Sequence, residues 1–220
     1  MIDAILFDLD GTLIDTAPDM GGALNKLLVE ENLAPIPLQQ IRPYVSQGGL
    51  VLTRLGFAGK VPDEEIEPLR QRFLQHYRAI VADKSRLFDG YEAVLAEIES
   101  REMPWGIVTN KPEWLTFPLL EQLGLASRAG VVIGGDSLQQ RKPHPLPLQV
   151  AAERLGVACE RCVYLGDDER DVVAAKAAKM KTLVAAYGYI EDAAAIAGWD
   201  ADGVIDQPGE LLEHQLMSPR

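Results

Sequence analysis

Short apolar runs and stretches of helical periodicity alternate regularly from about residue 90 to the end of the chain. Each apolar run has the length and the bounding turn residues of a buried strand. Strands are predicted at residues 105–109, 130–133, 162–165, 181–185 and 203–205, and helices at 91–100, 113–123, 146–155, 170–178 and 210–216. Strands that alternate with helices are joined by right-handed crossovers, which arrange them in a parallel sheet. The sequence therefore predicts an α/β fold.

A helical block separates the first predicted strand, Ala4-Ile5-Leu6-Phe7, from the rest of this sheet. The block shows helical spacing and is interrupted by a predicted turn at Ser46-Gln47-Gly48-Gly49. Helices within it include 38–44 and 50–55. We therefore predict a core formed by residues 1–15 and 86–220 and a helical cap formed by residues 16–85. Parallel sheets bind ligands at the carboxyl ends of their strands, so a block inserted there would cover the ligand site.

The charge balance limits the partners that this chain can bind. Its 33 acidic and 21 basic residues give a formal net charge of −12, whereas a surface for nucleic acid or anionic lipid needs a basic face. No apolar run approaches the ~20 residues that span a membrane, and no cationic segment precedes the first short run. Cys159 and Cys162 precede a strand, so they are expected to be ordinary thiols of a reducing compartment. We predict a cytoplasmic protein that binds neither nucleic acid nor membrane.

The first candidate functional stretch is Asp8-Leu9-Asp10-Gly11-Thr12, directly after the first strand. Side chains alternate along a strand, so Asp8 and Asp10 would point the same way. Two carboxylates at this distance repel each other unless a cation lies beside them, and Mg²⁺ prefers oxygen ligands that it can share with a phosphate. Gly11 allows a tight turn, and Thr12 adds a hydroxyl and an amide beside it. The plain alternative is a surface Asp-Gly turn.

Three further polar stretches each follow a predicted strand. They are Thr109-Asn110-Lys111, Lys142-Pro143 and Gly166-Asp167-Asp168-Glu169-Arg170-Asp171. Taken singly, each has a plain alternative as a helix cap, a solvated loop lysine or a turn. The carboxyl ends of parallel strands meet at one edge of a sheet, so all four stretches are expected to form one site. Such groups fit phosphoryl transfer through a covalent aspartyl-phosphate.

Each predicted catalytic role follows from the chemistry of the side chain. Asp8 would attack phosphorus, while Asp10 would protonate the leaving oxygen and then deprotonate the hydrolytic water. Thr109 would hydrogen-bond a phosphoryl oxygen, with the amide of Asn110 beside it. Lys142 would offset the negative charge of Asp8 and the phosphate.

A Mg²⁺ site is predicted from the acidic residues of the first and last stretches. Asp8, Asp10 and Asp167 are the predicted metal residues, because so many carboxylates need a divalent cation. Asp168 and Asp171 are left open, either as further ligands or as groups that orient the ligands.

The four stretches together resemble the motifs of the haloacid dehalogenase superfamily. The matching residues are Asp8-x-Asp10-Gly11-Thr12, Thr109, Lys142 and Gly166-Asp167-x-x-x-Asp171. The resemblance covers essentially the whole chain. It implies a Rossmann-like core with a helical cap inserted after the first motif, Mg²⁺ as cofactor, an aspartyl-phosphate intermediate, and the backbone carbonyl of Asp10 among the metal ligands. Asp10 argues against the dehalogenase branch itself, which lacks this acid and base and uses no metal.

Within the superfamily the chain is most similar to phosphoglycolate-phosphatase-type enzymes, and among these to the N-acetylmuramic acid 6-phosphate phosphatases of bacterial cell-wall recycling. The stretches that carry this similarity are Ser85 to Gly90, Trp105 to Pro112, Gly166 to Asp171 and Tyr187-Gly188-Tyr189-Ile190. The resemblance implies a phosphatase that acts on a small phosphorylated metabolite, as a monomer or homodimer. Two alternatives remain open: a phosphomutase of the β-phosphoglucomutase kind, which shares all four motifs, and a non-catalytic regulatory or binding protein.

The residues predicted to bind substrate come from two parts of the chain. They are Gly11, Thr12 and Asn110 on the phosphate side, and Ser46, Gln47 and Gly48 in the cap. Two glycines would let backbone amides of the cap approach a ligand, while Ser46 and Gln47 offer hydrogen bonds. The alternative is an ordinary loop between helices.

Overall fold

A parallel sheet forms the centre of the computed structural model, which describes residues 2–217. Its strand order is β5-β4-β1-β6-β7-β8, and every neighbouring pair is parallel. The strands are β1 Ala4–Phe7, β4 Trp105–Val108, β5 Val131–Ile133, β6 Cys162–Gly166, β7 Lys181–Ala185 and β8 Gly203–Ile205. The predicted α/β fold is confirmed, with β1 near the middle of the sheet.

Helices cover both faces of this sheet. They are α5 Tyr91–Ser100, α6 Glu113–Gln122, α7 Leu146–Leu155, α8 Glu169–Ala177 and α9 Glu210–Glu213. Side chains of β1 alternate between two hydrophobic clusters: Ile5 and Phe7 pack with residues of α5 and α9, whereas Ala4 and Leu6 pack with residues of α7 and α8. Burial of β1 on both faces explains why its sequence is a continuous apolar run.

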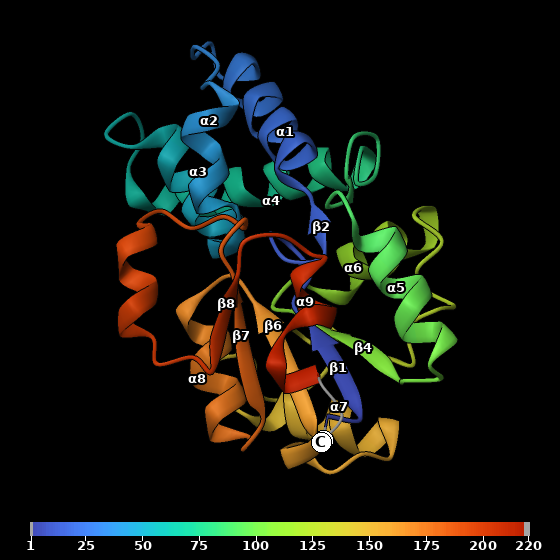
Figure 1. Ribbon diagram of the computed structural model, residues 1–220. Coiled ribbons are helices and arrows are strands. Elements are labelled where there is room, and N and C mark those ends of the chain that lie inside the picture. The colour runs from blue at the N-terminus through green and yellow to red at the C-terminus, as the bar shows by residue number, and fades with distance from the viewer. Residues whose placement is uncertain (1, 218–220) are drawn as a thin grey trace.

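The helical block lies beyond one end of the sheet (Figure 1). It contains α1 Ala17–Glu30, α2 Leu38–Ile41, the 3₁₀ helix η1 Arg42–Gln47, α3 Gly49–Phe57 and α4 Asp63–Ala79. A two-stranded antiparallel pair, β2 Ile14–Asp15 and β3 Arg86–Leu87, joins the block to the core. The division into a core and a separate cap domain stays a prediction. Among residues 2–217, no helix combines the length and apolar character needed to cross a membrane.

Several local predictions were wrong in detail. The helix expected at 38–44 ends at Ile41 and continues as η1, where Pro43 lacks the backbone N–H that an α-helix would need. Ser46 and Gln47 therefore end a 3₁₀ helix, and the turn itself is made by Gly48 at a positive φ of 87°. The helix expected at 210–216 ends at Glu213, and the 3₁₀ helix η4 Gln215–Met217 follows it. Two further 3₁₀ helices, η2 Cys159–Arg161 and η3 Ala193–Gly198, had no counterpart in the prediction.

Candidate active site

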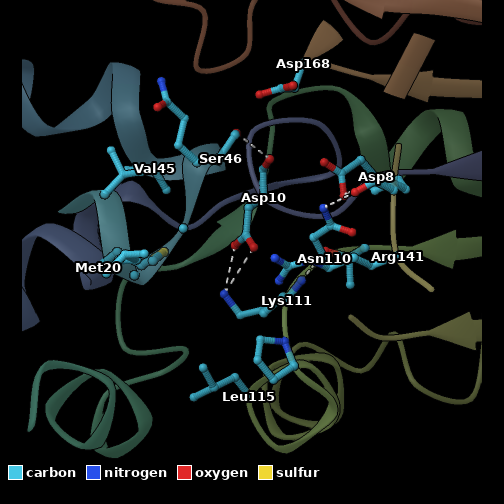
Figure 2. A pocket seen from close by; sticks show the side chains of 18 of the residues that line it. Asp8, Asp10, Met20, Val45, Ser46, Asn110, Lys111, Leu115, Arg141 and Asp168 are labelled. Carbon is cyan, nitrogen blue, oxygen red and sulfur yellow. Dashed lines mark hydrogen bonds and ion pairs between the residues drawn. The ribbon is translucent and has the colours of Figure 1, made fainter. Parts of the chain in front are cut away.

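A cavity of about 550 Å³ lies between the helical block and the carboxyl ends of the strands. Loops after β1, β4, β5 and β6 form its core side, and η1, α3 and α4 contribute from the block. Predicted site residues that line it are Asp8, Asp10, Thr109, Asn110, Lys142, Ser46, Gln47 and Gly48. Figure 2 shows that the carboxylate of Asp10 points towards Lys111, while Asp8 lies apart from this pair. The structure thus brings the strand-end motifs to one place, as expected for parallel strands.

Lys142 is fully enclosed and holds the carboxylate of Asp8 in place. Its Nζ lies 2.8 Å from Oδ1 of Asp8 and 2.7 Å from Oδ1 of Asp171, and it donates a hydrogen bond of 2.7 Å to the hydroxyl of Tyr164. Two carboxylates thus lie at ion-pair distance from this ammonium group, and the Tyr164 hydroxyl accepts its hydrogen bond. Burial disfavours the charged form, but Asp171 and Asp8 more than offset it and raise the pKa of Lys142. A permanently charged lysine therefore faces Asp8.

Asp10 has a different set of partners, because its carboxylate turns towards the block. The hydroxyl of Thr16 donates a hydrogen bond of 2.5 Å to Oδ1 of Asp10. The ammonium of Lys111 lies 2.9 Å from Oδ1 and 3.2 Å from Oδ2. The same ammonium stands 4.5 Å from the ring centroid of Tyr77 in α4. Sequence reasoning gave Lys111 no role, although its position in the same strand-end loop as Thr109 was the available signal.

Three buried acidic residues could hold a metal ion. Carboxylate oxygens of Asp8, Asp167 and Asp171 all lie within 4.8 Å of one another. Burial first, and then the charges of Asp8 and Asp171, raise the pKa of Asp167 well above its ordinary value. Burial also raises the pKa of Asp171 to about 7, against the opposing effect of Lys142. Closely spaced carboxylates of this kind fit a hard divalent cation, which would stabilise their charged forms.

The side chain of Asp10 does not belong to this acidic cluster. Its backbone carbonyl oxygen lies 3.0 Å from the hydroxyl oxygen of Ser46, which in turn lies 2.8 Å from Oδ2 of Asp167. Any contribution of Asp10 to the metal site would therefore come from this carbonyl. Asp168 instead caps α8, where its side chain accepts from the backbone N–H of Arg170 and pairs with the guanidinium of Arg170 at 2.6 Å.

The remaining predicted phosphate-side residues divide into two groups. Thr109 and Asn110 line the cavity, and the Asn110 amide donates to the carbonyl oxygen of Lys142 at 3.0 Å. Gly11 and Thr12 instead lie against Asp167. The hydroxyl of Thr12 donates to Oδ1 of Asp167 at 3.2 Å. Gly11 has a φ of 84°, and a Cβ there would collide with Oδ2 of Asp167.

The loop after β7 also contacts the acidic cluster, and sequence reasoning gave it no role. The backbone N–H of Tyr189 donates to Oδ2 of Asp167 at 2.8 Å. The hydroxyl of Tyr189 donates to Oδ1 of Asp15 at 2.6 Å and accepts from the N–H of Ala17 at 2.9 Å. A Cβ at Gly188 would collide with the Cβ of Asp167. The only sequence signal was the stretch Tyr187-Gly188-Tyr189-Ile190, which follows a strand as the other motifs do.

The cavity wall contains further residues to which sequence reasoning gave no role. Its apolar part includes Met20, Val45, Leu50, Leu74, Tyr77 and Leu115. Three arginines, Arg70, Arg141 and Arg170, add positive charge to Lys111 and Lys142. The lining thus contains five cationic and three acidic side chains, and the excess of cations suits an anionic ligand.

A family model, curated relatives and solved structures all relate this chain to the same group of hydrolases. Residues 5–185 match the family described as haloacid dehalogenase-like hydrolase. A phosphoglycolate phosphatase of Xanthomonas campestris pv. campestris is 48% identical over 96% of this chain and 95% of its own length. An N-acetylmuramic acid 6-phosphate phosphatase of Pseudomonas aeruginosa is 39% identical over 96% of this chain and 94% of its own. The crystal structure of a predicted phosphoglycolate phosphatase from Haemophilus somnus superposes with a TM-score of 0.85 at 25% identity, covering 96% of this chain and 97% of that one.

Proposed function

The chain belongs to the haloacid dehalogenase-like hydrolases and is a phosphatase, and from this premise we propose that it hydrolyses a small phosphomonoester through a phosphoryl-Asp8 intermediate. The observation that carries the proposal is the separate environment of the two carboxylates that line the cavity. Asp8 is paired with the buried ammonium of Lys142, whereas Asp10 is held by Thr16 and Lys111. Two carboxylates with different partners suit two different chemical roles.

The first half-reaction transfers the phosphoryl group to Asp8. A carboxylate oxygen of Asp8 forms a bond to phosphorus while the bond from phosphorus to the leaving oxygen breaks, and Asp10 gives that oxygen a proton. Lys142 offsets the charge that gathers at Asp8 and the phosphoryl oxygens, with Thr109 and Asn110 beside them. In the second half-reaction Asp10 takes a proton from water, the water oxygen attacks phosphorus, and inorganic phosphate and free Asp8 result.

Mg²⁺ belongs to the same proposal. The groups that would hold it are the carboxylates of Asp8 and Asp167 and the carbonyl oxygen of Asp10, with Asp171 orienting Lys142 beside them. When bound, the cation supplies neutralisation of phosphate charge. An all-oxygen donor set of this kind supports Mg²⁺ rather than a softer metal.

We propose that the substrate is a sugar acid phosphate such as N-acetylmuramic acid 6-phosphate, rather than the two-carbon phosphoglycolate. A cavity of about 550 Å³ lies within the range of pockets that enclose drug-sized ligands and far exceeds the needs of a two-carbon acid. Its apolar wall suits a ring or an acetyl group, and its arginines suit a carboxylate. The residues of the helical block, 16–85, act as the cap that supplies most of the apolar side chains of this wall. The enzyme would serve cell-wall recycling in the cytoplasm, as a monomer or homodimer.

Measurements of phosphate release test both the proposed reaction and the proposed substrate. Purified enzyme with Mg²⁺ should hydrolyse N-acetylmuramic acid 6-phosphate with a kcat/KM at least ten times that for phosphoglycolate, and Asp8→Asn should hydrolyse neither. Higher kcat/KM for phosphoglycolate would contradict the substrate but not the reaction. Interconversion of glucose 1-phosphate and glucose 6-phosphate without phosphate release would favour the phosphomutase alternative.

The order of the two half-reactions has its own test. Rapid quenching should trap labelled phosphate on wild-type protein, none on Asp8→Asn, and a slowly formed adduct on Asp10→Asn. Near-native turnover by Asp8→Asn would contradict the covalent mechanism. If the wild type retained its turnover in excess chelator, the proposed metal site would be wrong, but the covalent mechanism would still stand.

A further inference from the structure

One short element, η1, makes polar contacts with β2 and with the loop after β7. At its start, the guanidinium of Arg42 lies 3.0 Å from Asp15 and 5.0 Å from the ring centroid of Tyr189. In its middle, the hydroxyl of Tyr44 donates to Glu191 at 3.0 Å. These two contacts fix how η1 lies on the core, and they direct the end of the element, which carries Ser46, into the acidic cluster.

Ser46 contacts two oxygens that the proposed function assigns to the cation. Its hydroxyl oxygen lies 2.8 Å from Oδ2 of Asp167 and 3.0 Å from the carbonyl oxygen of Asp10. In Figure 2, Ser46 approaches Asp10 from the cap side. A hydroxyl has a single proton to donate, so it cannot satisfy both acceptors fully at once. The sequence predicted Ser46 as a substrate contact, whereas the structure directs its hydroxyl to these oxygens.

Asp167 is closed off from the cavity in this arrangement. The residue is 2% exposed. Asp167 is absent from the cavity lining formed by residues 2–217, although Asp8 and Asp10 belong to that lining. The core supplies two of its hydrogen-bond donors, the hydroxyl of Thr12 and the N–H of Tyr189, and the cap supplies the third, Ser46. Of these three, only the donor from the cap can leave without unfolding the core.

We propose that Ser46 competes with the divalent cation for Asp167 and the Asp10 carbonyl, so that cation binding loosens the closed cap. The inference rests on the proposed function for the cation site. Coupling between two binding events is reciprocal. The factor by which cation binding weakens the contacts of Ser46 is therefore also the factor by which these contacts lower the affinity for the cation. Binding of the cation would then release Ser46 from these oxygens and leave η1 held to the core by Arg42 and Tyr44.

The first test measures cation affinity without substrate. Mn²⁺ binding is followed by the loss of the electron paramagnetic resonance signal of the free ion, and Mg²⁺ affinity by displacement of Mn²⁺. Ser46→Ala should bind Mg²⁺ about 3- to 10-fold more tightly, because one net hydrogen bond to a carboxylate no longer competes. Ser46→Thr keeps the hydroxyl and should restore wild-type affinity. The matched control is Ser100→Ala, which removes an exposed hydroxyl from α5 and should leave the affinity for Mg²⁺ unchanged.

The second test measures the cap itself. Amide hydrogen exchange of residues 42–57 in the wild type should become faster when Mg²⁺ is added, because the hold of Ser46 is lost. In Ser46→Ala the same segment should exchange faster already, and Mg²⁺ should add little. Exchange in α7, on the opposite side of the sheet from the cap contacts, serves as the internal reference.

Two outcomes separate the failure of this inference from that of the proposed function. If the wild type binds Mn²⁺, Asp167→Asn does not, and Ser46→Ala binds it equally or more weakly, the cation site stands and the competition is wrong. If the wild type and Asp167→Asn bind Mn²⁺ alike, the proposed cation site is wrong, and the competition falls with it.

Discussion

Lys142 shows how a buried ammonium group is fixed by three partners around one nitrogen. Its Nζ forms ion pairs with Asp8 and Asp171 and donates a hydrogen bond to Tyr164, and the side chain is 1% exposed. Arginine keeps the charge but presents a planar fork that does not match three partners around one nitrogen. We expect Lys142→Arg to lower kcat by about 100-fold or more, in the range found when one charge-stabilising donor is lost. Steady-state phosphate release measures this.

The control for this substitution is the fold of the variant. Circular dichroism and the urea midpoint should show that Lys142→Arg remains folded, so that its low kcat reports the site and not unfolding. A kcat within 10-fold of the wild type would contradict the requirement for the ammonium geometry.

The acidic cluster predicts how stabilisation by Mg²⁺ depends on pH. The folded protein raises the pKa of Asp171 to about 7 and that of Asp167 well above its ordinary value. Folded carboxyls therefore bind protons more tightly than unfolded ones. Without a cation, Asp171 makes the protein less stable as pH rises from about 4 to about 7, and Asp167 acts in the same direction. A cation needs the deprotonated forms. The increase in Tm caused by Mg²⁺ should therefore grow from pH 5 to pH 8.

Thermal melts at fixed Mg²⁺, with matched melts in chelator, measure this increase. Asp167→Asn is the control, since it removes one ligand and should show a small increase at every pH. An increase in the wild type that is the same at pH 5 and pH 8 would contradict the proposed link between these carboxyls and the cation.

At the scale of elements, strands that are long and buried could be predicted, whereas contacts between cap and core could not. The run Ala4–Phe7 could be predicted because it is continuously apolar, and Asp8 and Asp167 could be singled out because each directly follows an apolar strand; Lys142 lies in the longer loop between β5 and α7. The two-residue strands β2 and β3 are too short to show any periodicity. Contacts such as Lys111 with Tyr77 depend on how one element lies over another, which no local pattern encodes.

The loop after β7 carries a prediction at this scale. Tyr189→Phe keeps the ring beneath Arg42 but removes the hydroxyl that serves Asp15 and the buried N–H of Ala17. Leaving a buried donor unpaired costs about 1–3 kcal/mol, so the free energy of unfolding should fall by that amount. Tyr44→Phe loses an exposed hydrogen bond to Glu191 and should change it by less than about 0.5 kcal/mol. Urea unfolding measures both, and equal values would contradict the structural role of Tyr189.

The whole molecule combines a net charge of −12 with a cavity that gathers arginines and lysines. Most of these cations are paired with carboxylates: Arg70 with Glu67, Lys111 with Asp10, Lys142 with Asp8 and Asp171, and Arg170 with Asp168. Arg141 is the exposed cation of this cavity wall, on the core side, just before Lys142. Its position suits a second anionic group of the substrate, beyond the phosphate that Lys142 and the cation would serve.

Arg141→Gln should therefore separate substrates by their carboxylates. We expect KM for a sugar acid phosphate to rise about 3- to 10-fold, as for loss of one charged hydrogen bond at a partly solvated site. KM for p-nitrophenyl phosphate, which has no carboxylate, should change by less than about 2-fold. The matched control is Arg154→Gln, which removes the same charge from an exposed position on α7 outside the cavity lining, so that any change it shows reflects only the long-range field. If Arg141→Gln raised both KM values equally, Arg141 would act on the phosphate or on the field of the whole molecule, and the carboxylate contact would be wrong.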